Sequence, residues 1–300
     1  MPSGLEWIAT PAFARAVIHA AAPLYLGVLA ALLCQRAGLV NLGIEGMMLA
    51  GACAGAAVAL GLGPAAGTAT GTMAGTALAL LHALATIRFR VGQLVSGLAV
   101  NVLAFGVAGL LSGAAFGPGG RSSGLGHLPV VAVPWLGPLS PLAPLALLLG
   151  LAILVELRLG VTGLRLDACA EAPQAAVRAG LELERLRYGA LLASGALAGL
   201  AGAGLSTEFV GHYQPGITQG RGFLALAVCL LVNRSVLAAA AAAVLLGGLQ
   251  ALPAFLPAGQ AAGLLVAAPW LVALVALTVL AGRVRLPRAV AETWRAGASP

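Results

Sequence analysis

RLGVTGLRLDACAEAPQAAVRAGLELERLR, from Arg158 to Arg187, is a polar island in an otherwise apolar chain. It holds nine of the 25 charged side chains, which are 16 arginines and nine acids. Hydrocarbon would not tolerate this density of charge, and a simple link between two helices would not need this length. The segment therefore predicts a polar platform that projects from a bundle of membrane helices and offers a binding surface to a soluble partner.

The composition of the whole chain is that of a membrane protein. Sixty per cent of its residues are hydrophobic, 8% are charged and the mean hydropathy is +1.01, whereas soluble domains have about 25% charged residues. The 42 glycines suit helices that associate through small residues, since lipid gives them no hydrophobic reason to associate. We expect an all-α polytopic membrane protein with one transmembrane domain over residues 1–300 and a cytoplasmic loop over 158–187.

The apolar stretches and the arginines together predict a topology. If the island is cytoplasmic, 13 of the 16 arginines lie inside, and only Arg15, Arg121 and Arg221 do not, as the positive-inside rule prefers. The N-terminus is then outside and the C-terminus inside. About eight or nine transmembrane helices are expected, from apolar stretches near 14–34, 43–61, 66–87, 93–115, 141–157, 188–206, 216–232, 235–252 and 261–281.

Two segments have the composition of interrupted helices. Residues 36–46 (RAGLVNLGIEG) and 211–222 (GHYQPGITQGRG) each combine glycines with polar side chains beside an apolar span. In transporters, helices interrupted at corresponding places in two halves indicate the translocation pathway. We therefore expect broken helices at both places.

The two interrupted segments also align as an inverted repeat. Glu45-Gly46 and Arg221-Gly222 each precede an apolar run, a short break and a second apolar run. In this alignment His82 corresponds to Gln250, and the predicted topology gives the two hairpins opposite directions. Glu45 and Arg221 are also candidates for an ion pair across the repeat axis.

Polar side chains within the spans are the candidates for a substrate pathway, because such residues usually face the bundle interior. Gln93, Gly97 and Asn101 recur every four residues and form one stripe of a helix, which suits a pathway wall. Hydrogen bonding that only fixes the bundle is the alternative. The candidate set is Asn41, Glu45, His82, Gln93, Ser96, Asn101, Thr218 and Arg221.

Four blocks in order resemble one family of transporters. RAGLVNLGIEGMMLAGA (36–52) is similar to the signature of ABC-importer permeases of the branched-chain amino acid, sugar and nucleoside superfamily. Residues 92–101 resemble its DQIVSGLALN, 163–180 its cytoplasmic GLRLRAVGENPRAADTAGI, and 218–223 its TAGRGF. The resemblance covers roughly residues 10–285 and is greatest to the nucleoside-type permeases.

The platform departs from the family pattern at several positions. Asp167 stands where the family usually has a base, Ala170 replaces a glycine and Ala172 replaces an asparagine. Residues 230–237 (LLVNRSVL) lack the usual turn similar to FGRWNP. These departures leave open a weakened or altered contact with an ATPase.

A short amphipathic helix is predicted within the platform. Pro173 favours a first helical turn, and Gln174 to Arg185 would place Val177, Leu181 and Ala176 on one side. The resemblance implies that this is the coupling helix of an importer; a solvated loop is the alternative. The candidate coupling residues are Arg165, Glu171, Pro173, Gln174, Val177, Arg178 and Leu181.

The resemblance implies the permease subunit of an ATP-driven importer for nucleosides or related purine compounds, in the bacterial cytoplasmic (inner) membrane. Its implied partners are a separate ABC ATPase, a second homologous permease that makes a heterodimer, and an extracytoplasmic substrate-binding protein. The chain has no lysine for a P-loop, so we expect ATP to bind to the partner and no cofactor to bind here. The Gly/Pro-rich loop 116–140 is a candidate contact for the binding protein, or else a flexible link.

Several alternatives stay open at this stage. The same architecture serves importers of simple sugars and of branched-chain amino acids. An ion-coupled secondary transporter would need a membrane carboxylate, for which Glu45 is the candidate. A membrane enzyme would need a paired nucleophile and base, and no Ser/His or paired Asp pattern is evident, so we expect no enzyme. The scattered cysteines and histidines predict no metal site, and the excess of arginine is attributed to membrane topology rather than to nucleic acid.

Overall fold

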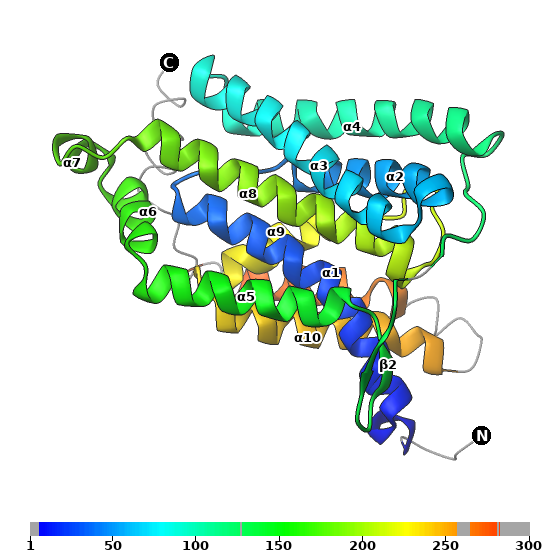
Figure 1. The fold of residues 1–300 in the computed structure, drawn as a ribbon. Helices are drawn as coiled ribbons and strands as arrows, with labels where there is room; N and C mark the ends of the chain where they lie inside the picture. The colour runs from blue at the N-terminus through cyan, green and yellow to red at the C-terminus, as the bar shows by residue number, and fades with distance from the viewer. Residues whose placement is uncertain (1–5, 127, 257–264, 281, 283–300) are drawn as a thin grey trace.

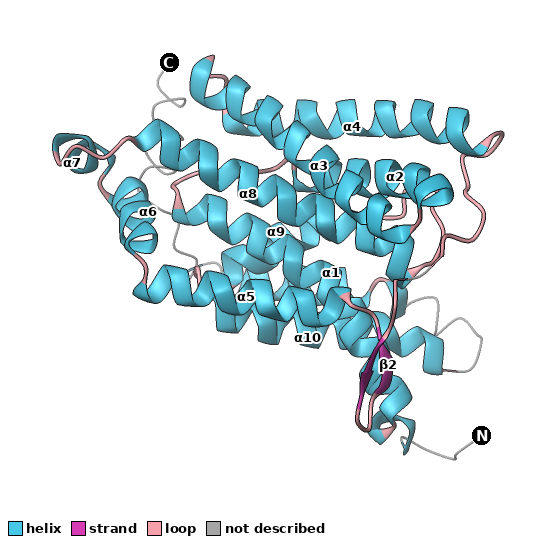
Figure 2. Ribbon diagram, viewed as in Figure 1, coloured by secondary structure: helices cyan, strands magenta, loops and turns pink. Residues whose placement is uncertain are grey.

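The computed structural model describes residues 6–126, 128–256, 265–280 and 282, and this part is a bundle of helices (Figures 1 and 2). The predicted all-α polytopic membrane fold is confirmed. Seven helices of the described part are long and apolar enough to cross a membrane. They are α1 (Pro11–Arg36), α2 (Ile44–Leu62), α3 (Pro64–Ala83, extended to Arg88), α4 (Gln93–Phe116), α5 (Leu142–Leu159), α8 (Leu183–Gly204, extended to Phe209) and α10 (Val236–Ala251, extended to Phe255).

Two further apolar helices lie at the remaining predicted spans but are shorter. They are α9 (Arg221–Leu231) and α12 (Ala268–Leu280). Eleven residues of α9 extend about 16 Å at 1.5 Å per residue, roughly half of a bilayer core. The predicted span over 216–232 therefore contains a half-length helix, as expected for an interrupted segment.

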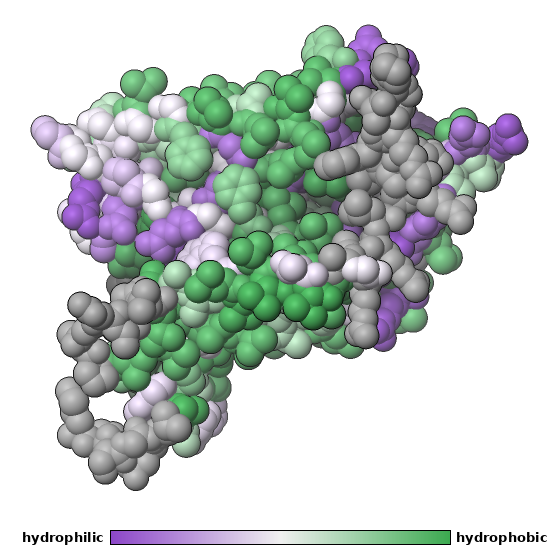
Figure 3. All heavy atoms as spheres, turned by 180° about the vertical axis from the view of Figure 1, so that it is seen from behind, coloured by the Kyte–Doolittle hydropathy of each residue, from purple (hydrophilic) through white to green (hydrophobic). Residues whose placement is uncertain are grey.

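Short elements that do not span the membrane occupy the two ends of the bundle. At one end α6 (Val161–Glu171) and α7 (Pro173–Arg178) form the platform (Figure 1). At the other end β1 (Val131–Val133) and β2 (Gly137–Leu139) make an antiparallel hairpin. A separate 3-10 turn at Glu6–Ala9 precedes α1. From behind, hydrophobic side chains cover the middle of the surface and hydrophilic ones gather toward its ends (Figure 3). This distribution suits a bundle that crosses the cytoplasmic membrane several times.

The described arginines other than Arg221, which is buried inside the bundle, divide between the two ends as the topology predicts. Arg36 and Arg234 form ion pairs with the platform, and the turn between α3 and α4 lies at the same end (Figure 1). Arg15 donates to the carbonyl oxygen of Leu136 in the hairpin at the opposite end. Four arginines of the predicted count, at positions 283, 285, 288 and 295, lie outside the described residues.

Part of the helix packing follows the predicted inverted repeat. α3 packs along α8 in the way that α10 packs along α1, and α2 contacts α8 as α9 contacts α1. Exchanging α1 with α8, α2 with α9 and α3 with α10 therefore maps these interfaces onto each other, but α2 packs closely along α3 whereas α9 barely contacts α10. This correspondence is the one that the sequence alignment of Glu45 with Arg221 predicts, and it places the starts of α2 and α9 near the axis that relates the halves.

Glycines bring the backbones of α2, α3 and α8 into contact. A Cβ atom at Gly75 of α3 would collide with the carbonyl oxygen of Gly195 in α8. One at Gly71 would collide with the carbonyl of Gly51 in α2, and one at Gly202 with that of Met48. The abundance of glycine is thus used for close helix association, as expected where lipid supplies no hydrophobic drive.

The platform differs from the predicted helix over 174–185. α7 ends at Arg178, because Gly180 adopts a left-handed φ of +81° and α8 begins at Leu183. The predicted common face is also wrong, since Ala176 is buried while Val177 is 58% exposed. The additional helix α6 precedes it and carries Cys169 in its buried side, where burial raises the pKa of the thiol. The four cysteines are buried within helices, as expected for small apolar side chains.

The topology gives a first testable prediction. Cysteines introduced at Val177 on the platform and at Trp135 on the hairpin, both well exposed, should react with a membrane-impermeant maleimide from opposite sides of the membrane. The native thiols are buried and should contribute little background. Labelling of intact cells should modify the Trp135→Cys variant alone, whereas inverted vesicles that contain this chain without partner proteins should expose Val177→Cys. The reverse pattern would contradict the orientation.

Candidate functional site

The starts of the two interrupted helices meet inside the bundle. Glu45, in the first turn of α2, is 2% exposed and faces the first turn of α9. Its carboxylate accepts hydrogen bonds from the backbone amides of Gly220, at 3.0 Å, and Gly222, at 2.7 Å. A carboxylate is well placed there because the N-terminus of a helix carries free amides and a partial positive charge.

The predicted ion pair between Glu45 and Arg221 is wrong. No ion pair joins these two side chains in the described part of the chain, and the carboxylate binds the backbone on either side of Arg221 instead. Gly222 permits this approach, since a Cβ atom there would lie 2.6 Å from the backbone nitrogen of Glu45. The contact therefore depends on a glycine beside an arginine, and a bulkier residue would separate the two helices.

Backbone geometry explains why α9 begins at Arg221 and not at residue 216. Gly216 and Gly220 both have positive φ angles, +74° and +78°, which other residues adopt at a cost. The chain between them makes turns and enters the bundle without helical hydrogen bonds. The amides freed by this interruption are the ones that Glu45 binds.

The guanidinium of Arg221 forms hydrogen bonds with α10 and with the turn before α9 rather than with Glu45. Arg221 is 8% exposed, and its Nε donates to the Oε1 atom of Gln250 at 3.0 Å. Its Nη1 donates to the carbonyl oxygen of Ile217 at 3.1 Å, and its guanidinium lies 5.6 Å from the ring centre of Phe209. Thr218 is buried beside it, with a hydroxyl that has no hydrogen-bond partner among the described residues. The guanidinium thus closes the second interrupted segment against α10.

The stripe on α4 closes the first interrupted segment. Gln93 accepts a hydrogen bond from the amide of Val40 at 2.8 Å. Asn101 accepts one from the amide of Gly46 at 2.8 Å and donates one to the carbonyl of Leu42 at 2.9 Å. Gly97 lies between them, and a Cβ there would collide with Leu42. The predicted single face of α4 is confirmed, and it satisfies backbone groups that the interruption leaves without helical partners.

The other predicted pathway residues form two further contacts. Asn41 donates to the hydroxyl of Ser194 in α8 at 3.0 Å and accepts from the amide of Gly43 at 3.0 Å. His82 and Ser96 form a separate pair between α3 and α4, with 2.8 Å between Nδ1 and Oγ. The eight candidates thus fall into two groups around the interrupted segments and one separate pair. Seven of them are at most 8% exposed, and Gln93 is half-buried, so the site is closed in this chain alone.

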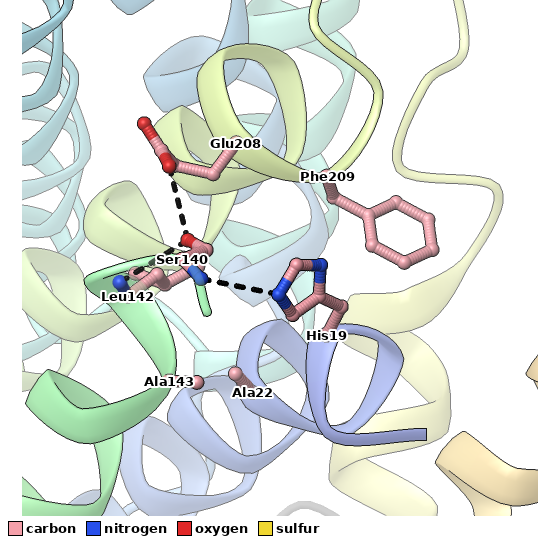
Figure 4. Close-up of a pocket in the computed structure, with 7 residues that line it drawn as sticks. All are labelled: His19, Ala22, Ser140, Leu142, Ala143, Glu208 and Phe209. Atoms are coloured by element: carbon pink, nitrogen blue, oxygen red, sulfur yellow. Dashed lines mark hydrogen bonds between the residues drawn. The ribbon is translucent and has the colours of Figure 1, made fainter. Parts of the chain in front are cut away.

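A carboxylate missed by the sequence reasoning lies at the hairpin end of the bundle. Glu208, in the wider last turn of α8, accepts a hydrogen bond from the hydroxyl of Ser140 at 3.0 Å and one from the amide of Leu128 at 3.1 Å. The amide of Ser140 donates to Nε2 of His19 at 3.1 Å (Figure 4). These bonds fasten the loop between α4 and α5 to α1 and α8. The available signal was an acid directly after the apolar stretch 188–206 and before the interrupted segment.

Ion pairs tie the platform to the bundle. Arg36, at the end of α1, contacts Asp167 of α6 at 2.7 Å, and Arg234, between α9 and α10, contacts Glu171 at 2.7 Å. Glu171, predicted to contact an ATPase, is therefore engaged within the chain. Four predicted coupling residues are exposed, and Pro173 and Leu181 are partly buried; the exposed ones are Arg165, Gln174, Val177 and Arg178.

Comparison with known proteins gives one family and several relatives. The family model described as "Branched-chain amino acid transport system / permease component" matches residues 14–283. A guanosine ABC transporter permease protein of Bacillus subtilis is 29% identical over 90% of this chain and 92% of its own length. A putative glucose ABC transporter permease protein of Haloferax volcanii is 32% identical, over 73% and 70%. A nucleoside ABC transporter permease protein of Lactococcus lactis is 27% identical, over 85% and 87%. No solved structure gives a significant match.

Proposed function

The chain belongs to the family of permease components of branched-chain amino acid transport systems, and we propose that it serves an ATP-driven importer of nucleosides or related purine compounds. The match covers almost all of the described bundle, including both interrupted segments and the platform. Two of the three relatives reported above are permeases for guanosine or nucleosides. The third is a putative glucose permease, so simple sugars are the second candidate substrate class.

The observation that carries the proposal is the exposed platform at the arginine-rich end. Val177 is 58% exposed at the tip of a short helix, with Gln174 and Arg178 exposed beside it. An apolar side chain ringed by polar and charged ones is the arrangement by which a small helix binds in a groove of a soluble partner. The partner is an ABC ATPase that binds ATP, and its movement on ATP binding would displace the platform.

The translocation pathway is the second part of the proposal. One chain supplies half of it, and a second homologous permease, most simply in a heterodimer, supplies the other half. The two interrupted segments border the pathway, with the candidate set from Asn41 to Arg221 around them. In the closed arrangement their polar atoms bind backbone groups, and opening would release them toward a polar solute. The outer loop that Glu208 anchors is the surface for a substrate-binding protein.

Uptake by a reconstituted complex tests the function. The chain, its ATPase, the second permease and the binding protein would be placed in proteoliposomes and supplied with radiolabelled guanosine or glucose. We expect uptake of guanosine that requires ATP, and little uptake of glucose. A preference for glucose would contradict the nucleoside assignment and support an importer of simple sugars. Uptake by this chain alone, driven by an ion gradient without ATP, would contradict the importer and favour a secondary transporter.

The platform predicts a loss of coupling in a single variant. Val177→Asp places a charge at the centre of the proposed contact, so the ATPase should no longer co-purify with the permease and ATP-dependent uptake should be lost. Glu182→Gln, which removes an exposed charge next to the platform, is the matched control and should retain both. Normal uptake by Val177→Asp would contradict the assignment of α7 as the ATPase contact.

A further inference from the structure

We propose that α9 transmits displacement of the platform to the meeting point of the interrupted helices. This inference rests on the proposed function and goes beyond it. In this role Asp167 and Arg234 are positioning residues at the cytoplasmic end of α9. Glu45 is the corresponding contact at its inner end. The helix therefore connects the ATPase contact with the candidate pathway.

The cytoplasmic end of α9 is bound to the platform. Arg234, three residues after α9, contacts Glu171 of α6 at 2.7 Å, and its backbone carbonyl accepts a hydrogen bond from Arg36 at 3.0 Å. Arg36 in turn contacts Asp167 at 2.7 Å. α6 is thus joined both to the end of α1 and to the turn after α9, which belong to the two halves of the repeat.

The turn that presents Arg234 is itself under constraint. Asn233 and Arg234 are consecutive residues with left-handed φ angles of +47° and +66°. Such a pair of non-glycine residues is uncommon and persists where the surrounding contacts determine it. Arg234 in this turn contacts the platform directly, so a movement of the platform would act on the turn.

The inner end of α9 is bound just as closely. Glu45 holds the amides of Gly220 and Gly222, so the first turn of α9 cannot shift without moving the start of α2 or breaking both hydrogen bonds. Between the two ends, α9 is an uninterrupted helix of 11 residues, buried along one side. A short, packed helix moves as a rigid body, so a displacement applied at Arg234 would reach Glu45.

The contact between Asp167 and Arg234 is suited to change with the state of the transporter. Oδ1 of Asp167 and Nη1 of Arg234 lie 3.7 Å apart, beyond hydrogen-bond distance, and neither has a hydrogen-bond partner among the described residues. A small movement of α6 toward the turn would bring them to about 3 Å. Two of the departures from the family pattern, Asp167 and the segment 230–237, therefore face each other. A base at position 167 would instead repel both arginines.

The first test separates ATP hydrolysis from uptake in the complete complex. Asp167→Asn and Arg234→Gln should bind the ATPase normally and hydrolyse ATP, while uptake per ATP falls about tenfold. Asp167→Glu, which keeps the charge, should restore much of the loss, and Glu182→Gln should behave as the parent. Unchanged uptake per ATP in both variants would overturn the proposal. Loss of the ATPase from the complex would also overturn it, since the residues would then serve docking.

The second test needs no transported substrate. Spin labels at Met73→Cys on α3 and Phe223→Cys on α9, both exposed positions, report movement of α9 against the first half of the repeat. Binding of a non-hydrolysable ATP analogue should change their distance in the parent complex and leave it unchanged with Asp167→Asn. An equal change in both, or none in the parent, would overturn the proposal. Failure of the parent complex to take up nucleosides would contradict only the proposed function.

Discussion

Replacement of Glu45 by alanine is expected to abolish uptake while the ATPase still binds. The carboxylate is the hydrogen-bond acceptor for two buried amides at the start of α9, and each amide left without a partner costs about 1–3 kcal/mol. The helix terminus also loses the negative charge that its dipole favours. The start of α9 would then separate from α2, whereas the platform, at the other end of α9, would keep its exposed surface.

The measurement is ATP-dependent uptake together with recovery of the ATPase on the purified permease. Glu45→Gln should have an intermediate effect, since its carbonyl can accept from one amide while its NH₂ group faces the other. Glu184→Gln, at an exposed acid of α8, is the matched control and should transport normally. Normal uptake by Glu45→Ala would remove Glu45 from the site. A requirement for a proton gradient in place of ATP would instead support the secondary-transporter alternative.

Much of the fold could be predicted because lipid imposes simple requirements on sequence. A helix that crosses the bilayer needs a long apolar run, so the described spans lie close to their predicted limits. The correspondence of Glu45 with Arg221 also predicted that α3 packs on α8 as α10 packs on α1, although α9 and α10 do not pack together as α2 and α3 do. The start of α9 and the end of α7 could not be predicted from the sequence, because they depend on left-handed glycines at 220 and 180. Glycine is frequent throughout this chain, so its presence alone does not identify the few positions that end a helix.

The candidate site was predicted in its membership more than in its contacts. Opposite charges suggested that Glu45 and Arg221 pair, but each binds neutral groups: backbone amides for one, Gln250 and carbonyl oxygens for the other. Backbone partners have no signature in the side-chain sequence, so such contacts are visible only in the structure. Asp167 illustrates the same limit, since the reason for a negative charge at this position is evident only from the two arginines beside it, Arg36 and Arg234.

Substitution of Gly199 by valine is expected to prevent the bundle from forming. A Cβ atom at this position would lie 2.5 Å from the carbonyl oxygen of Gly71 and 3.0 Å from the Cα atom of Gly75. These are backbone atoms, which cannot rotate away as a side chain can, so α3 and α8 would have to separate along their length. Overpacking costs about 1–3 kcal/mol even where neighbours can adjust, and the cost here should exceed that range.

The readout is the yield of monodisperse protein after extraction in detergent, with Gly109→Val as the matched control. Gly109 lies in α4, where a Cβ atom would meet nothing within 4 Å. Valine also has a somewhat better helix propensity than glycine, so this second substitution should leave the yield unchanged or raise it slightly. The pair isolates close approach from the general effect of valine in a helix. Similar yields from both variants would mean that α3 and α8 do not depend on backbone contact, and that the glycines serve another purpose.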